Sequence, residues 1–161
     1  MKLWTIQKTD PLNTLFSNGI LRGDWRRVWK SFKPSYRWLC QKMEERGILL
    51  GGRPPIWAWT EKPDLRQGGY LSKGEKGVRM ELLVPDNLIL LSNFEAWHFV
   101  LNNWNLPYDV EDADIDKKNE KSWERIFELD NLKGYNKAVQ ATLPFLKLEW
   151  VIGSTFFIAR G

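Results

Sequence analysis

The sequence predicts an α+β fold, in which N-terminal helices pack on a small, mostly antiparallel, split sheet. Two observations predict it: helical spacing of apolar residues dominates residues 10–47, and β-like alternation dominates from residue 56 onward. Because the helices come early and the strands late, with little strand–helix–strand alternation, a doubly wound parallel sheet is not favoured. At 161 residues, the chain is expected to form a single domain spanning residues 1–161.

The N-terminal third predicts one strand and three helices. Residues 2–7 have the pattern of a short opening strand. Asp10 and Pro11 predict a helix start, because Asp caps and Pro suits the first helical position, and Gly19 is typical of a helix end. Two further helices are expected within residues 24–47, since apolar residues recur there at i, i+3, i+4 and i+7.

The rest of the chain predicts mainly strands. Residues 78–84 alternate with a period close to two, which favours a strand with one buried face. Ser92 and Glu95 fit a capping box, so a helix is expected to begin at Ser92 and to carry an apolar stripe as far as Trp104. Other expected elements are strands at 56–60, 88–91, 138–142, 146–152 and 155–158, a polar loop at 61–77 and a last helix ending by 134.

Charge is unevenly distributed along the chain. Residues 1–80 hold 16 basic and 7 acidic side chains, a net +9, and residues 81–161 hold 8 and 13, a net −5. This asymmetry suggests an anionic ligand, or self-association through opposite patches. If residues 22–33 are helical, a cationic face forms along one side, either as a solvated surface or as a binding surface for nucleotide or nucleic-acid phosphates. The basic residues concerned are Arg22, Arg26, Lys30 and Lys33.

Several classes of protein are disfavoured by composition. Cys40 is the only cysteine and His98 the only histidine, so neither a disulfide nor a zinc site is expected, and no metal cofactor is predicted. No signal peptide and no apolar run of the roughly 20 residues that cross a bilayer is present, so we expect a cytoplasmic protein without a membrane partner. The ten tryptophans indicate an indole-rich core, a stacking surface, or both.

Polar side chains interrupt the predicted strands. If these strands are neighbours, the polar residues form a seam across an apolar sheet, which is either internal hydrogen-bonded structure or a ligand cleft. The residues are Thr5, Gln7, Thr60, Glu61, Gln140, Thr142 and Glu149.

Four segments carry a resemblance to a known family. They are LWTIQ, YRWLCQKMEERG, PIWAWTE and LLVPDNLILLSNFEAWHFVLNNW, in this order. Together they resemble a bacterial family of small cytosolic domains of unknown function, over most of the chain. This resemblance implies no activity.

The order of segments is also similar to a compact ADP-ribosyltransferase. In that superfamily an opening strand contacts NAD, a middle strand offers an aromatic residue or Ser, and a late strand offers the catalytic Glu. Carried over by resemblance, the opening position is Trp4 or Thr5, the middle position lies within residues 57–60, and the late position is Gln140 or Glu149.

Two hypotheses about function follow, and a third is the structural or self-associating protein whose basic and acidic halves pair by charge. In the first, the protein is an ADP-ribosyltransferase-like protein of the toxin or defence type that binds NAD or a related nucleotide. The cofactor-binding residues would be Trp4, Thr5, Arg26, Arg53, Trp57, Trp59 and Thr60, and the catalytic residues Gln140 and Glu149. In the second, it is a non-enzymatic binding module whose basic helix face docks nucleic acid or an acidic protein partner.

Overall fold

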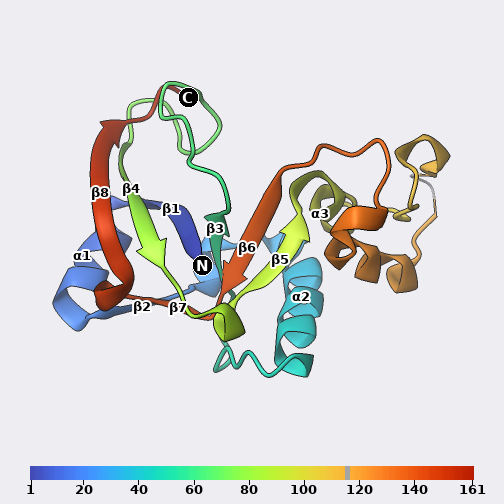
Figure 1. The fold of residues 1–161 in the computed structure, drawn as a ribbon, viewed down its shortest axis with the longest axis horizontal. Coiled ribbons are helices and arrows are strands. Elements are labelled where there is room, and N and C mark those ends of the chain that lie inside the picture. The colour runs from blue at the N-terminus through green and yellow to red at the C-terminus, as the bar shows by residue number, and fades with distance from the viewer. Residues whose placement is uncertain (115–116) are drawn as a thin grey trace.

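The computed structural model describes residues 1–114 and 117–161 and has the predicted α+β architecture (Figure 1). Six strands form one antiparallel sheet in the order β5-β6-β3-β1-β4-β8, and β2 pairs with β7 separately. The strands are β1 (Lys2–Lys8), β2 (Ile20–Arg22), β3 (Ile56–Trp59), β4 (Lys76–Leu83), β5 (Leu90–Asn93), β6 (Val139–Leu143), β7 (Phe145–Lys147) and β8 (Val151–Ile158). The α-helices described are α1 (Thr9–Asn18), α2 (Lys33–Glu45) and α3 (Phe94–Leu101).

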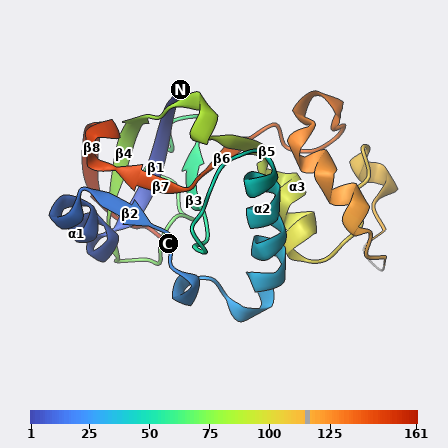
Figure 2. The same cartoon turned by 90° about the horizontal axis from the view of Figure 1, so that it is seen from below.

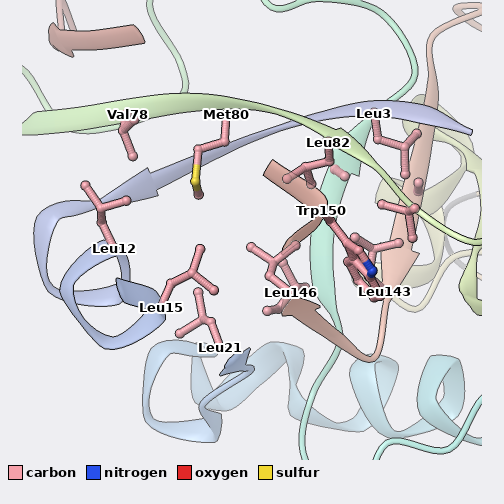
Figure 3. Close-up of a cluster of buried hydrophobic side chains, with 14 residues drawn as sticks. Leu3, Leu12, Leu15, Leu21, Val78, Met80, Leu82, Leu143, Leu146 and Trp150 are labelled. Carbon is pink, nitrogen blue, oxygen red and sulfur yellow. The ribbon is translucent and has the colours of Figure 1, made fainter. Parts of the chain in front are cut away.

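One face of the sheet packs on α1 and on the β2–β7 pair. Alternate residues of β1, β3, β4 and β6 point to this face, as the period of a strand requires, and they meet Leu12 and Leu15 of α1. Figure 3 shows this cluster, with Trp150 packed beside the leucines. Removing such a leucine side chain from a packed core costs about 2–5 kcal/mol, so these contacts fix α1 against the sheet.

The opposite face of the sheet packs on α2 and α3, at the β5 end. Trp38, Leu39 and Met43 of α2 share a second core with Trp97 and Val100 of α3. Figure 2 shows the resulting division, with α1 near β8 and the pair α2–α3 near β5. The two cores therefore lie on opposite faces of the sheet and near opposite ends of it.

The helix expected at the start of residues 24–47 does not form. The structure has two short 3-10 helices instead, η1 (Trp25–Arg27) and η2 (Lys30–Phe32), separated by extended backbone. The apolar spacing was misleading because its residues have no core to pack on: Trp29 is 73% exposed. Pro34 does not break a helix but occupies the first turn of α2, where its missing N–H costs nothing. The continuous cationic helix face predicted for residues 22–33 is therefore absent.

The capping box predicted at Ser92 is also wrong. Ser92 belongs to β5, and the Asn93 side chain caps α3 by accepting a hydrogen bond from the Ala96 N–H. The Glu95 carboxylate accepts the Asn136 N–H rather than closing a box.

Further 3-10 helices lie among the described residues after β4, and η5 replaces the predicted last α-helix. They are η3 (Asp86–Leu88), η4 (Val110–Asp112), η5 (Glu120–Phe127), η6 (Leu129–Asn131) and η7 (Leu148–Trp150), of which η5 falls where the α-helix was expected. None of the helices in the described ranges combines the length and apolar character needed to cross a bilayer.

Candidate functional site

The sheet is split between β1 and β3. These strands share a single register pair, Trp4 with Trp59, whereas β1 pairs with β4 at seven positions. Beyond Trp4 the two strands diverge, and a side chain replaces the backbone ladder: the Thr5 hydroxyl donates to the Trp57 carbonyl at 2.9 Å. Gln7 Nε2 in turn donates to Thr5 Oγ1 at 3.0 Å. The divergence opens a space beside the second half of β1.

A cleft of about 590 Å³ occupies this space, within the range of small-ligand sites. Its walls come from β1, α1, the start of α2, the residues around η1 and the entry to β3. The polar and aromatic lining residues are Gln7, Thr14, Asn18, Arg22, Asp24, Arg26, Arg27, Tyr36, Arg53 and Trp57.

Local sequence holds the arginine-rich wall in place. Asp24 caps η1 by accepting the Arg26 N–H, and the Trp25 indole donates to the Gly52 carbonyl at 2.8 Å. Gly23 lies so close to Pro54 that an added Cβ would stand 2.0 Å from the Pro54 carbonyl oxygen. Only glycine allows this approach, so η1 is anchored on both sides to the loop that precedes β3.

Positive charge dominates the cleft. Four arginines and one carboxylate line it, and that carboxylate, Asp24, is already paired. Arg26 Nε and Nη2 both hydrogen-bond to Asp24, which lowers the pKa of the Asp24 carboxyl to about 2. Arg53 Nη1 donates to the Gly23 carbonyl at 3.2 Å, and the Arg27 guanidinium makes no hydrogen bond or ion pair with a described residue, since Arg27 bonds only through its backbone N–H to the Asp24 carbonyl. Arg27 is thus available to an anion.

Aromatic rings form the inner wall of the cleft. Trp57 Nε1 donates to the Tyr36 hydroxyl at 3.0 Å, and the two rings meet edge to face with centroids 6.0 Å apart. Both rings also contact Trp97, which is buried in the second core. Burial raises the pKa of the Tyr36 hydroxyl, so it stays protonated and can donate a hydrogen bond.

A family model, described as a domain of unknown function (DUF3841), matches residues 2–119 of the chain. The chain belongs to the DUF3841 family. The match includes every residue that lines the cleft. No curated protein and no solved structure matches the chain.

In this DUF3841 protein, three of the residues predicted to bind a cofactor lie in the cleft: Arg26, Arg53 and Trp57. They come from η1, the loop before β3, and β3. Their distance in sequence spans 31 positions, and the fold of η1 against that loop brings them together. Their roles in binding stay predictions.

The other predicted cofactor-binding residues lie outside the cleft lining. Thr5 is buried at the split, with its hydroxyl donated to the Trp57 carbonyl. Trp4 and Trp59 are opposite each other in the register of β1 and β3, and Trp59 packs against Phe94. The Thr60 hydroxyl donates to the Val139 carbonyl at 2.9 Å.

The two residues predicted to be catalytic lie apart from the cleft and from each other. Gln140 is buried in β6, where its Nε2 donates to Ser92 Oγ at 3.2 Å. Glu149 lies in η7 with its side chain 72% exposed, beside Lys147. The strands β1, β3 and β6 are neighbours, as the seam hypothesis required. Every buried polar side chain in the described part of the chain, however, is hydrogen-bonded internally.

The sequence did not predict the other lining residues as part of the site, and Gln7, Arg22, Arg27 and Tyr36 are among them. Gln7 was noted as part of the polar seam and Arg22 as part of a cationic helix face. Tyr36 lies within residues 24–47, where apolar spacing predicted helices, and no role was predicted for it. The signal that could have found the arginines is the sequence Arg22-Gly23-Asp24, since a glycine followed by a capping residue is typical of a turn rather than of a helix interior.

Proposed function

We propose that this DUF3841 protein binds a nucleotide, or a similar phosphorylated ligand with a planar ring, in the cleft at the sheet split. The observation that supports it best is the excess of arginines over carboxylates around a cleft of about 590 Å³ with an aromatic inner wall. Arginine suits phosphate because its planar guanidinium offers paired N–H donors.

Arg27 and Arg53 are the residues we assign to phosphate. Both are exposed to solvent at the cleft, and neither is paired with a carboxylate among the described residues. Arg26 is assigned a supporting part, because its contacts with Asp24 fix the position of η1. A phosphate between Arg27 and Arg53 would thus meet two positive charges that no carboxylate of the described residues neutralises.

Tyr36 and Trp57 are the residues we assign to the ring of the ligand. The Trp57 indole N–H is already used by Tyr36, so Trp57 can offer only its ring surface, while the Tyr36 O–H can donate to a ligand acceptor. Each ring is only partly buried and has the second core behind it. The inner wall is therefore held rigidly before a ligand arrives.

NAD is the member of this class that the ADP-ribosyltransferase resemblance names, and an enzyme of the toxin or defence type would use it. Gln140 and Glu149 do not line the cleft. For this reason the proposal is nucleotide binding, and transfer of ADP-ribose is an outcome to be measured rather than a part of it.

Isothermal titration of the full chain with NAD, ADP and inorganic phosphate tests the proposal. We expect NAD and ADP to bind, and Arg27→Gln to weaken both by about 10- to 100-fold, the loss expected for one charged hydrogen bond. Arg160→Gln is the matched control, because Arg160 is exposed and lies outside the cleft. The proposal is overturned if none of the three ligands binds. It is also overturned if Arg27→Gln and Arg160→Gln lose affinity equally. Incubation with labelled NAD in the same samples measures transfer.

A further inference from the structure

Trp29 forms an exposed aromatic platform beside the cleft. It is 73% exposed, and its ring stacks on Phe32 with centroids 5.6 Å apart and an interplanar angle of 13°. Trp29 directly follows Val28, which lines the cleft. A large apolar ring held flat by a second ring, with its outer face in water, offers a stacking surface.

The segment that carries the platform is rich in basic residues. Residues 22–37 include six cationic side chains and a single carboxylate, Asp24. This carboxylate already forms an ion pair with Arg26. Lys30 follows Trp29 directly and is exposed, and Arg27 lies two residues before it at the cleft. The surface therefore combines a stacking ring with cations on both sides of it in sequence.

We propose that this surface binds single-stranded nucleic acid, with one nucleotide in the cleft and a neighbouring base stacked on Trp29. The inference rests on the proposed nucleotide-binding cleft and names its ligand as a polynucleotide. Bases stack on exposed aromatic rings without regard to sequence, and cations track the phosphates. A double helix hides its base faces, and the irregular backbone around η1 and η2 offers no α-helix to enter its groove. An acidic protein would use the cations, but its carboxylate side chains offer no ring to stack on Trp29.

Fluorescence anisotropy of a labelled oligothymidylate about ten nucleotides long tests the inference on the full chain. Trp29→Ala should weaken binding by at least about fivefold, the usual effect of losing one stacked base, and Trp29→Phe should restore most of it. Phe156→Ala is the matched control, since Phe156 is 69% exposed and lies on β8. Lys30→Gln should reduce the slope of log affinity against log salt by about 0.7. Circular dichroism checks that the variants fold.

Three results would overturn the inference: unchanged affinity in Trp29→Ala, equal or tighter binding of the same sequence as a duplex, or competition by polyglutamate as effective as by unlabelled oligonucleotide. The outcomes also separate this inference from the proposed cleft function. If ADP binds and the oligonucleotide binds no more tightly than ADP, only the inference is refuted. Oligonucleotide binding that depends on Trp29, without binding of ADP or NAD, refutes the cleft proposal and leaves the platform.

Discussion

The Asp24 carboxylate organises the arginine-rich wall of the cleft. It accepts hydrogen bonds from the backbone N–H and from the guanidinium of Arg26, and it caps η1. These contacts favour its charged form, so they lower its pKa. The order of η1 is therefore tied to the ionisation of this one residue.

We predict that the Asp24 carboxyl titrates near pH 2 in the folded protein. Because its pKa is lowered from 3.8 to about 2, ionised Asp24 favours the folded state at neutral pH, and this contribution is lost as the pH falls from about 4 to about 2. Carboxyl NMR titration measures the midpoint. Arg26→Gln should move it upward, and a wild-type midpoint near 4 would contradict the hydrogen-bonded arrangement.

Cys40 is predicted to react slowly with thiol reagents. Burial raises the pKa of its thiol to about 11, and Sγ lies 3.9 Å from the Arg53 carbonyl oxygen. At pH 8 the thiolate fraction, and hence the rate of alkylation, should be about 100-fold lower than for a thiol of ordinary pKa. Iodoacetamide labelling followed by mass spectrometry measures this rate. In concentrated urea the same residue should react at the ordinary rate, and rapid labelling of the folded protein would show that the thiol is accessible.

At the scale of elements, the junction of β1 and β3 decides where the cleft forms. The two strands keep one register pair and then separate, and the Thr5 side chain spans the gap to the Trp57 carbonyl. Gln7 completes this bridge by donating to Thr5. A hydroxyl thus replaces the backbone N–H that a continuous ladder would have supplied.

Thr5→Val is predicted to lower the free energy of unfolding by about 1–3 kcal/mol. The substitution keeps the shape of the side chain but leaves the partly buried Trp57 carbonyl without its donor. Urea denaturation measures the loss. Thr5→Ser retains the hydroxyl and should lose less stability. Thr60→Val is the matched control, because the Thr60 hydroxyl also donates to a carbonyl but is partly exposed. Equal stability of Thr5→Val and wild type would show that the bridge contributes nothing.

Gly23→Ala is predicted to weaken ligand binding without touching the ligand. Its Cβ would meet the Pro54 carbonyl oxygen at 2.0 Å, so η1 must move away from the loop before β3, and the arginines of the two segments separate. We expect a loss of about 1–3 kcal/mol in stability from the overpacking and a higher dissociation constant for NAD. Gly153→Ala, where the nearest atom would be 3.5 Å away, should change neither quantity. Unchanged affinity in Gly23→Ala would argue against the cleft as the binding site.

At the scale of the whole molecule, the sheet ends in an exposed edge at β8. This strand spans Val151–Ile158 and contains neither a charged residue nor proline. Ile152, Phe156 and Ile158 are all more than 45% exposed. The register with β4 shifts next to Ile152, and Phe156 and Ile158 share one face of the regular stretch that follows. Natural edge strands are usually protected by charge, bulges or coverage, and a long apolar edge favours pairing with another strand.

Self-association through β8 is therefore predicted at high protein concentration. Light scattering over a dilution series should show a rise in mean mass that Phe156→Lys reduces, since a charge on the edge opposes strand pairing. Phe16→Lys places the same charge at another exposed phenylalanine, on α1, and should leave the mass unchanged. A single monomeric mass at every concentration would exclude association by this edge.

The positions of the strands were the most predictable part of the fold. Residues 56–60, 78–84 and 138–142 each fall on a strand within a few positions, because alternation of buried and exposed side chains is a local property. The helices were less predictable. Trp25 and Trp29 have helical spacing, but spacing alone does not show whether a core exists on that side of the chain. Ser92 and Asn93 are both good capping residues, and only the end of β5 selects Asn93.

The types of residue at the candidate site were predictable from the sequence, but the particular residues that line it were not. Basic and aromatic residues were expected to meet an anionic ring-bearing ligand, and Arg26, Arg53 and Trp57 do line one cleft. Polar residues within strands were poor guides. Thr5 and Gln140 have their donors bonded internally, because a buried polar group must be paired whether or not it has a function.

The sequence by itself determined the α+β class, the uneven charge and the surplus of indoles, since these depend only on composition and on periods of two and 3.6 residues. The tertiary structure alone decided which of these side chains share a space. Gly23 packs on Pro54 and Tyr36 bonds to Trp57, over 31 and 21 positions of chain. Such contacts exist only where β1 and β3 part, and no local pattern in the sequence records where two strands stop pairing.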